Sequence, residues 1–385
     1  MSQELNKVPD TPEEMADALR RASEQNLSVL IRGAGTKIDW GRPPQRIDTI
    51  LSTRGLRRIL AHQHGDLTAT IEAGASLREV NLALALHKQW LPLDPSFAAD
   101  ATIGGILATN DSGPLRHRHG TPRDLVIGTQ VATADGLLAK SGGQVVKNVA
   151  GYDLSKLLAG SFGSLAAIVS ATFKLSPLPA TSKTLIVTAR DAPGLARLVR
   201  DVMASHLEPI AFEAEVPASS LLLRFASARP AVEAQADAAQ QLLGAGRLVA
   251  GDEERVLWQQ HNERIWSGEG AVVRSSWLPS DIATVAEDLE SLSAMGGIRH
   301  VELVGRAAIG TGLIRIDGDP TSQSRAIDRL RRSASMGNVV LLRGSSDLKA
   351  LVDVWGSHGD REPVFASLKR AFDPKGILNA GRGPL

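Results

Sequence analysis

Residues 101–113 have the sequence ATIGGILATNDSG, and this stretch bears most directly on the fold. Gly104 and Gly105 remove side chains at the point where a short helix is expected to start. Because the first N–H groups of a helix have no partner within it, they can face a ligand. Short polar side chains flank the two glycines: Thr102, Thr109, Asn110 and Ser112. Two interpretations stay open, a backbone that binds a ligand and a glycine-rich loop that packs tightly.

Two further stretches place glycine beside an expected strand. RGAGTK (32–37) follows an apolar strand at 27–31, and its amides from Gly33 to Lys37 could form an anion-binding concavity or an ordinary turn. It matches neither the GxGxxG fingerprint nor the Walker A motif. The stretch at 158–175, LAGSFGSLAAIVSATFKL, again puts glycine before a strand. Such turns on distant segments, without a metal-ligand motif or nucleophile elbow, indicate a large phosphate-bearing cofactor.

Composition narrows the class of protein. The chain has 385 residues, with 43 Lys and Arg against 42 Asp and Glu, so no basic field favours nucleic acid as a partner. There is no cysteine, so the chain cannot form a disulfide or ligate its own iron–sulfur cluster through thiolates. The N-terminus lacks the apolar core of a secretory signal, and no apolar run reaches transmembrane length. We therefore expect a cytoplasmic protein without a membrane span of its own.

Helix and turn signals divide the chain into two parts. Thr11 and Ser76 are expected to cap helices, and Asp135-Gly136 marks a hairpin turn. Pro177 and Pro179 mark a boundary, and beyond it strands and helices alternate in two rounds. This alternation predicts an α+β domain with an antiparallel sheet.

Several motifs occur in an order that resembles a known family. IRGAGTK, LPLDPSFAADATIGGILATNDSG, RDLVIGTQVATADG and FDPKGILNAGR are similar to motifs of the FAD-linked oxidase family. The flavin domain of that family is the vanillyl-alcohol oxidase/p-cresol methylhydroxylase (PCMH) type. GGQVVKNVAGYDLSKLLAGSFGSLA (142–166) is most similar to the small FAD-binding subunits of bacterial glycolate oxidases, also called glycolate dehydrogenases. The resemblance covers about 29–179 and returns at 365–382.

The resemblance implies a fold. It implies a two-subdomain PCMH-type FAD-binding domain over 1–180, with subdomains at about 1–50 and 51–180. A smaller α+β cap domain with an antiparallel sheet would follow at 181–360. The C-terminal helix and tail, 361–385, would pack back near FAD.

The resemblance also implies a site for FAD. Carried over motif by motif, the cofactor-binding residues are Gly33, Ala34, Gly35, Thr36, Lys37, Asp94, Thr102, Ile103, Gly104, Gly105, Thr109, Asn110, Ser112, Gly113, Asp124, Ala167, Ile168, Val169 and Asn379. Members with covalent flavin often carry a histidine where this chain has Thr36, so we predict non-covalent FAD. Ala34 replaces a glycine of many relatives and fits only if its φ is negative.

Catalytic residues are harder to assign. Related D-2-hydroxyacid dehydrogenases carry a His-rich motif in the cap, but the matching stretch, 305–316, has no histidine, so we expect no metal. Arg274 could bind a substrate carboxylate or lie on a solvated strand face. Tyr152 could face the cofactor or be a half-buried packing residue. His117 and His119 could flank the flavin or lie in an exposed loop. No base is assigned.

Three functions remain open at this point. The resemblance implies an FAD-binding subunit of a complex that oxidises glycolate to glyoxylate. Its partners would be a larger FAD-binding subunit and an iron–sulfur subunit, which would hold it at the periphery of the inner membrane. The alternatives are a stand-alone FAD-dependent D-lactate or 2-hydroxyacid dehydrogenase, and an FAD-containing assembly or electron-relay subunit without turnover of its own.

Overall fold

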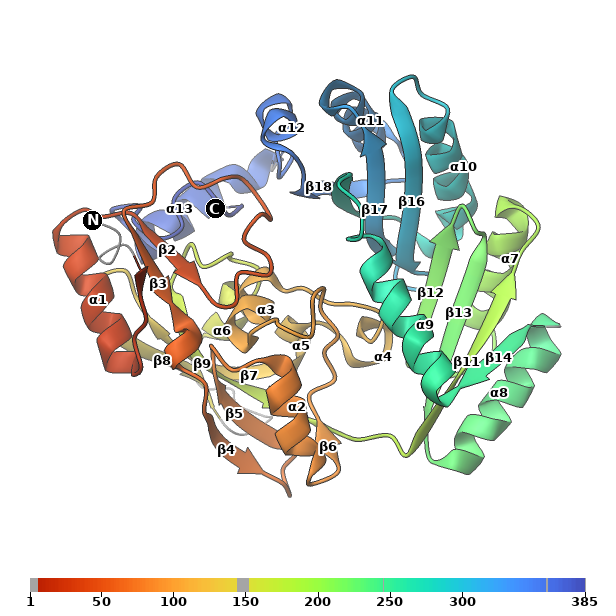
Figure 1. The fold of residues 1–385 in the computed structure, drawn as a ribbon, viewed down its shortest axis with the longest axis horizontal. Coiled ribbons are helices and arrows are strands. Elements are labelled where there is room, and N and C mark those ends of the chain that lie inside the picture. Colours follow the sequence, from red (N-terminus) through yellow and green to blue (C-terminus); the bar gives the residue numbers. More distant parts are fainter. Residues whose placement is uncertain (1–5, 144–151, 245, 358, 385) are drawn as a thin grey trace. The chain divides into compact units, whose positions relative to one another are not determined.

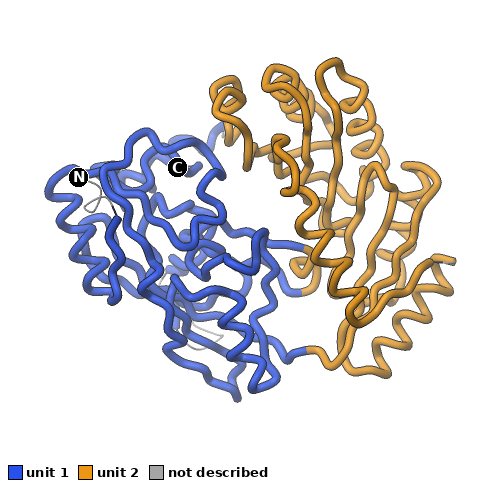
Figure 2. The backbone as a smooth tube through the Cα atoms, in the orientation of Figure 1, with its two compact units in different colours: residues 1–113, 119–178, 358–385 blue, residues 114–118, 179–357 orange. Residues whose placement is uncertain are grey.

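The computed structural model describes the following residues: 6–143, 152–244, 246–357 and 359–384. Most of the motif GGQVVKNVAGYDL (142–154) lies outside the described residues. The chain divides into two compact units, shown in separate colours in Figure 2. Unit 1 comprises 1–113, 119–178 and 358–385. Unit 2 comprises 114–118 and 179–357.

Unit 1 is built on three sheets (Figure 1). A parallel sheet has the order β1-β3-β2, an antiparallel sheet has the order β4-β5-β9-β7-β8, and β10 pairs with β6. The strands are β1 (Asn6–Lys7), β2 (Val29–Arg32), β3 (Thr49–Ser52), β4 (Ile59–Gln63), β5 (Thr68–Glu72), β6 (Gln89–Trp90), β7 (Val126–Ala132), β8 (Leu138–Gly142), β9 (Ala167–Lys174) and β10 (Ser176–Pro177).

The caps expected from the sequence start two helices of unit 1. Thr11 Oγ1 accepts from Glu14 N–H at 3.1 Å, and Ser76 Oγ accepts from Glu79 N–H at 3.2 Å. The hairpin between β7 and β8 turns at Gly136, whose φ is 82°. The helices are α1 (Pro12–Glu24), α2 (Leu77–Ala85), α3 (Ile103–Thr109), α5 (Pro122–Leu125), α6 (Leu154–Leu158) and α13 (Glu362–Phe372), while α4 (Arg116–His119) spans the division between the units.

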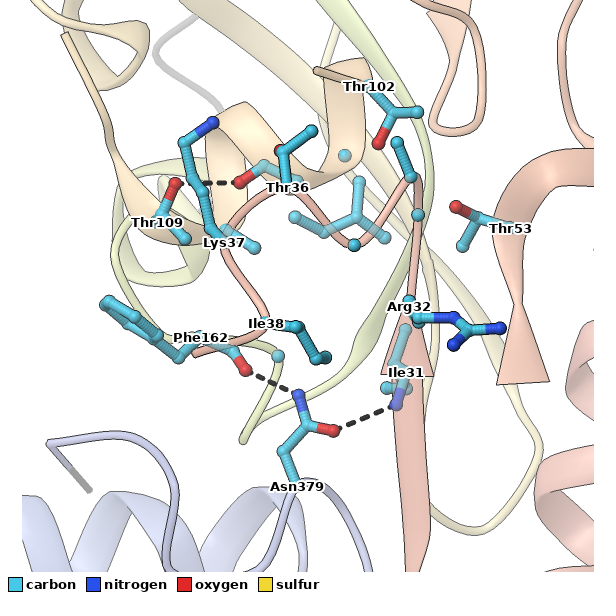
Figure 3. Close-up of a pocket in the computed structure, with 18 of the residues that line it drawn as sticks. Ile31, Arg32, Thr36, Lys37, Ile38, Thr53, Thr102, Thr109, Phe162 and Asn379 are labelled. Atoms are coloured by element: carbon cyan, nitrogen blue, oxygen red, sulfur yellow. Dashed lines mark hydrogen bonds between the residues drawn. The ribbon is translucent and has the colours of Figure 1, made fainter. Parts of the chain in front are cut away.

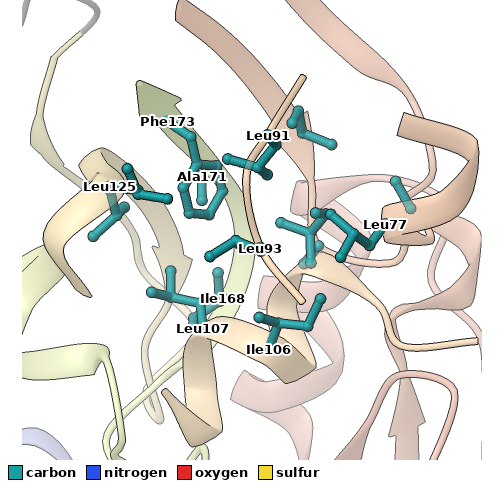
Figure 4. Packing of buried hydrophobic residues seen from close by; sticks show 14 of the residues in the cluster. Leu77, Leu91, Leu93, Ile106, Leu107, Leu125, Ile168, Ala171 and Phe173 are labelled. Atoms are coloured by element: carbon teal, nitrogen blue, oxygen red, sulfur yellow. The ribbon is translucent and has the colours of Figure 1, made fainter. Parts of the chain in front are cut away.

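The core of unit 1 places α3 against the antiparallel sheet. Ile106 and Leu107 of α3 are almost fully buried in one cluster with Ile168 and Phe173 of β9 (Figure 4). Burying side chains of this size stabilises the fold by about 1.5–3 kcal/mol each. The start of α3 is therefore held in a fixed position by its own apolar face.

The C-terminal tail returns to the parallel sheet. Leu378 forms a parallel bridge with Val29 of β2. Val29 N–H donates to Ile377 O at 2.8 Å, and Asn379 N–H donates to Val29 O at 2.9 Å. The tail thus extends the sheet next to the strand that enters the glycine turn.

Unit 2 is an antiparallel sheet with helices. Its strand order is β14-β11-β13-β12-β16-β17-β15-β18. The strands are β11 (Thr181–Thr188), β12 (Ala211–Val216), β13 (Ser220–Ser227), β14 (Arg247–Ala250), β15 (Ala271–Ser276), β16 (Ile298–Arg306), β17 (Thr311–Gly318) and β18 (Gly337–Arg343). The helices are α7 (Ala192–Met203), α8 (Arg229–Leu243), α9 (Gly251–Arg264), α10 (Ile282–Ser293), α11 (Pro320–Arg332) and α12 (Ser346–Leu351). The α+β fold class with an antiparallel second sheet is confirmed.

Within the described parts of the chain, no helix combines the length and the apolar character needed to cross a lipid bilayer.

Candidate functional site

A pocket in unit 1 lies where four distant segments meet: the turn after β2, the start of α3, the loop before β9 and the C-terminal tail (Figure 3). It holds about 680 Å³ of unfilled space, part of which opens to solvent. The lining residues are Ile31, Arg32, Gly33, Ala34, Gly35, Thr36, Lys37, Ile38, Thr53, Thr102, Gly104, Gly105, Ala108, Thr109, Phe162, Gly163, Ala166, Ile168, Asn379 and Arg382.

The turn after β2 forms the first wall. Gly35 has a φ of 84°, in the left-handed region that glycine adopts without strain. Ala34 lies outside that region, as its side chain requires. The peptide groups of this turn therefore line the pocket with little side-chain bulk in front of them.

Lys37 fastens this turn to a neighbouring loop. Its side chain is buried, and Nζ donates to Ser96 O at 3.0 Å and lies 3.3 Å from Asp111 Oδ2. Asp111 Oδ2 also accepts from Ser96 N–H at 2.8 Å. Burial lowers the pKa of Lys37, and the charge of Asp111 opposes that shift. The Lys37 ammonium is thus engaged in fixing the turn.

The start of α3 forms the second wall and carries an orphaned polar atom. Thr102 precedes the helix in extended conformation, but its side chain makes no capping hydrogen bond. Its Oγ1 is buried, and no hydrogen-bond partner for it exists among the residues that the structure describes. A Cβ added to Gly33 would lie 2.1 Å from this oxygen, and one added to Gly105 would lie 3.2 Å from it. A side chain at either glycine would therefore crowd the Thr102 hydroxyl.

Asn379 closes the pocket from the side of the tail (Figure 3). Its Oδ1 accepts from Ile31 N–H at 2.9 Å, and its Nδ2 donates to Phe162 O at 2.5 Å. A Cβ added to Gly163 would lie 2.6 Å from that Nδ2. One buried amide thereby joins the strand, the loop and the tail.

Arg382 holds the turn after β2 through its guanidinium group. Its Nη2 donates to Lys37 O and to Ile38 O, each at 2.6 Å. Burial lowers the pKa of Arg382 to about 10, and Asp39 opposes this shift. The sequence analysis did not select Arg382, although it lies three residues after Asn379 in the same tail motif.

The structure brings a majority of the predicted cofactor residues to this pocket. Those that line it are Gly33, Ala34, Gly35, Thr36, Lys37, Thr102, Gly104, Gly105, Thr109, Ile168 and Asn379. The sequence analysis missed Ile31, Arg32, Ile38, Thr53, Ala108, Phe162, Gly163, Ala166 and Arg382. Phe162 and Gly163 had a signal in the sequence, because both lie in the glycine-bearing stretch at 158–175. In the structure both have positive φ.

Other predicted residues have structural roles outside the lining. Asp94 Oδ1 accepts from Gly113 N–H at 3.0 Å, which joins two loops. Asn110 ends α3 with a φ of 48° and accepts from Arg123 N–H at 3.0 Å. The Asp124 carboxylate accepts from Thr121 N–H and Oγ1 at the start of α5.

The remaining predicted cofactor residues are buried or half-buried. Ile103, Ala167 and Val169 are fully buried, and the last two pack in a core cluster with α1. Ser112 is half-buried beside Asp111. None of these residues lines the pocket.

None of the catalytic candidates is among the residues that line the pocket. Arg274 is half-buried on β15 of unit 2, and Tyr152 of unit 1 is 91% exposed. The His117 ring lies edge-on to Phe212 within unit 2, with ring centroids 5.9 Å apart. The His119 ring lies edge-on to Trp90 within unit 1, with centroids 5.7 Å apart.

The pocket offers a ligand both hydrogen-bonding groups and apolar surface. Peptide groups of the glycine turn can approach such a ligand closely, and Thr102 Oγ1 can bind it. Apolar side chains of Ile31, Ile38 and Ile168 supply surface for a ring system.

Comparison with known proteins agrees with this description. Residues 6–142 match the family model of the FAD binding domain. The chain is 33% identical to glycolate oxidase subunit GlcD of Bacillus subtilis (strain 168) over 54% of this chain and 44% of that protein. It is 29% identical to glycolate oxidase subunit GlcE of Escherichia coli (strain K12) over 97% of each chain.

A third relative and a solved structure extend the comparison. The chain is 28% identical to a D-lactate dehydrogenase of Archaeoglobus fulgidus over 97% of this chain and 90% of that protein. An alkyldihydroxyacetonephosphate synthase structure aligns over 97% of this chain and 75% of that chain, with a TM-score of 0.70 and 16% identity. That likeness concerns the fold alone.

Proposed function

Because residues 6–142 match the family model of the FAD binding domain, we propose that the chain is an FAD-dependent 2-hydroxyacid oxidoreductase. More specifically, we propose the FAD-binding subunit of a glycolate oxidase complex, which converts glycolate to glyoxylate. The observation that carries the proposal is the pocket of unit 1, where a glycine turn and an orphaned hydroxyl meet inside the matched region. Similarity over the full length of GlcE supports the subunit assignment.

The residues present fit FAD. The buried Thr102 Oγ1 has no partner in the described part of the chain and borders the pocket, and Gly33 and Gly105 put no side chain against it. Peptide groups from Gly33 to Lys37 and the Thr102 hydroxyl would hold the cofactor, and Asn379 would lie beside it. Thr36 offers no imidazole for a covalent bond, so the FAD is non-covalent in this proposal.

The chain's own residues bind and orient the reactants. Bound FAD supplies a hydride acceptor for the oxidation of a hydroxyl-bearing carbon. Unit 2 is proposed as the cap and substrate domain, with Arg274 as the carboxylate-binding residue and Tyr152 as the second candidate for a catalytic role. Lys37 and Arg382 hold the glycine turn in place, because Lys37 Nζ donates to Ser96 O and Arg382 Nη2 donates to Lys37 O.

Partners follow from the proposed electron path. The chain has no cysteine, so electrons that leave its flavin must pass to another protein or to a small acceptor. We propose a larger FAD-binding subunit, similar to GlcD, and an iron–sulfur subunit as partners. The assembly would be cytoplasmic and would reach the inner membrane through those partners.

A second candidate is a stand-alone D-lactate dehydrogenase. The match to the Archaeoglobus fulgidus enzyme, which covers 90% of that protein, favours it. A third is an FAD-containing assembly or electron-relay subunit, favoured by the absence of histidine from 305–316.

The test is an absorption spectrum of the purified full chain, reconstituted with FAD and then mixed anaerobically with glycolate. Near-stoichiometric flavin that bleaches on glycolate supports glycolate oxidation in this chain. If D-lactate is tested in the same way, bleaching by D-lactate but not by glycolate supports the stand-alone enzyme. Flavin that bleaches with glycolate only after the partner subunits are added supports the relay subunit. A chain that holds no FAD as purified and binds none on reconstitution contradicts the proposed site.

A paired substitution ties the result to the pocket. Gly105→Val places a branched side chain against Thr102 in the lining, so we expect loss of FAD retention. Gly65→Val is the matched control, since a Cβ there meets nothing within 4 Å. Full flavin content in Gly105→Val would exclude the proposed position of FAD.

A further inference from the structure

Three histidines gather on unit 1 at a place remote from the pocket lining. His62 lies in β4, His64 follows in the turn to β5, and His87 lies in the turn after α2. One ring nitrogen of each lies within 4.8 Å of one ring nitrogen of each of the others. The His64 and His87 rings stack with centroids 3.8 Å apart, and the His62 ring lies edge-on to both.

A buried amide fixes the orientation and tautomer of His62. Gln89 is buried, and its Nε2 donates to His64 O at 2.9 Å. This bond directs Oε1 of the same amide to His62 Nε2, 2.8 Å away. Because an amide oxygen only accepts, His62 Nε2 must carry the proton, which leaves the lone pair on Nδ1. Metal-binding histidines are typically held by this kind of hydrogen bond to the other ring nitrogen.

The remaining two rings belong to exposed side chains. His64 and His87 are exposed, so both can adjust their side-chain torsions toward a common point. Neutral imidazole is the form that binds metal ions.

We propose that His62, His64 and His87 form a binding site for a divalent transition-metal ion of the zinc class. Zinc commonly takes three imidazole nitrogens at about 2.0–2.1 Å and a water in the fourth position. Imidazole ligands also suit copper, nickel and cobalt ions, whereas magnesium and calcium prefer oxygen ligands. The sequence analysis expected no metal because 305–316 lacks histidine, and this proposal departs from that expectation on the evidence of three histidines in another part of the chain.

The site would cross-link segments that lie far apart in the sequence. His62 and His64 belong to the β4–β5 hairpin, and His87 belongs to the connection from α2 to β6. Next to it, Lys88 O accepts from Leu178 N–H at 2.8 Å, and β6 pairs with β10. A bound ion would therefore stabilise the region where the chain leaves unit 1, by mass action on the folded state.

The test uses the full chain without an affinity tag, stripped of metal by chelation. Titration calorimetry with Zn²⁺ should give one equivalent, and Co²⁺ should produce the absorption of a low-symmetry nitrogen-ligated site. His64→Ala and His87→Ala should each weaken Zn²⁺ binding by at least tenfold. His206→Ala, which removes an exposed histidine of unit 2, should leave binding unchanged.

The outcomes are separable from the flavin proposal, because the titration is done with and without FAD. Equal unfolding temperatures of all variants without metal would show that the substitutions leave the fold intact. Absence of one-equivalent binding to the unsubstituted chain would overturn the site. Unchanged binding in both His64→Ala and His87→Ala would overturn it as well.

Discussion

Thr102 carries a buried hydroxyl whose lack of a partner among the described residues lowers the stability of the chain. Its buried Oγ1 has no partner in the described part of the chain, and such a group costs about 1–3 kcal/mol. Thr102→Val keeps the shape of the side chain and removes the hydroxyl. We expect the flavin-free chain to be as stable as before or more stable by about 1 kcal/mol, while FAD affinity falls about tenfold.

The measurement is urea unfolding of the flavin-free variant together with FAD titration. Thr109→Val is the matched control, because Thr109 lines the same pocket but its Oγ1 already donates to Gly105 O at 2.8 Å. The Thr102 interpretation fails if Thr102→Val destabilises the flavin-free chain and leaves FAD affinity unchanged.

At the residue scale, the sequence identifies positions where glycine or a short polar side chain allows a ligand to approach the backbone closely. Gly33, Gly105 and Thr102 are of this kind, and all three line the pocket. Ala167 and Val169 are different, because alternate residues of a strand point to opposite faces. Ile168 lines the pocket, whereas its two neighbours pack in a core cluster. The family motif located the strand without specifying which face met the pocket.

At the scale of elements, the tail, β2 and the loop before β9 depend on one side chain. Asn379 makes two side-chain hydrogen bonds and has a φ of 44°, which asparagine tolerates better than alanine. Asn379→Ala should lower the free energy of unfolding by about 3 kcal/mol, from two lost buried bonds and the left-handed backbone. FAD affinity should fall with it, because the pocket wall loosens.

Chemical unfolding with a fluorescence readout measures this effect. Asn26→Ala is the control, since Asn26 has a φ of 52° on an exposed turn and should cost only about 1 kcal/mol. Equal losses in the two variants would mean that the amide bonds of Asn379 contribute nothing.

In unit 2, α9 is anchored to β12 by a buried charged cluster. His261 Nδ1 lies 2.7 Å from Glu215 Oε1, and Nε2 lies 3.2 Å from Glu213 Oε2. Burial opposes the protonation of His261, but the hydrogen bonds and charges of the two glutamates outweigh it and raise its pKa. Arg264 joins the cluster at 2.8 Å from Glu215 Oε2.

The sign of the pH effect follows from this raised pKa. A raised folded-state pKa contributes stability that is fully present below the unfolded value of 6.5 and is lost as pH rises through the folded pKa. Burial lowers the pKa of His117. The contribution of His117 to stability is therefore lost only as the pH falls below 6.5, which lies below the range in which His261 titrates. Unit 2 should therefore lose stability as the pH rises above 6.5 through the raised pKa of His261.

Urea unfolding across pH 7 to 9 checks this, with segment-resolved hydrogen exchange to follow unit 2. His261→Gln cannot titrate, so its stability should vary less over the same range even though it starts lower. A parallel decline in both proteins would assign the pH effect to other groups.

Local signals predicted elements better than they predicted the site. The caps at Thr11 and Ser76 and the hairpin at Gly136 depend on a few adjacent residues, and the structure contains all three. The Lys37–Asp111 contact and the Arg382 bonds join residues far apart in the chain. No periodicity in the sequence signals such pairs, because they depend on how the loops and the tail fold back.

At the scale of the whole molecule, all residues that line the pocket belong to unit 1. A ligand stabilises the part of the structure that binds it, by about 2.7 kcal/mol at a concentration of one hundred times its Kd. FAD should therefore slow amide exchange about a hundredfold in β2, α3 and the 377–382 tail. Strand β14, at the edge of the sheet of unit 2, should exchange at the same rate with and without FAD.

Hydrogen exchange with mass spectrometry, done with and without saturating FAD, resolves these segments. Thr102→Val at the same FAD concentration supplies the internal control, because weaker binding should reduce the protection of α3 in proportion. Protection in unit 1 alone would place the full binding energy in the pocket described. Equal protection of β14 would mean instead that FAD stabilises the chain as one cooperative unit, so that its binding energy is shared between both units.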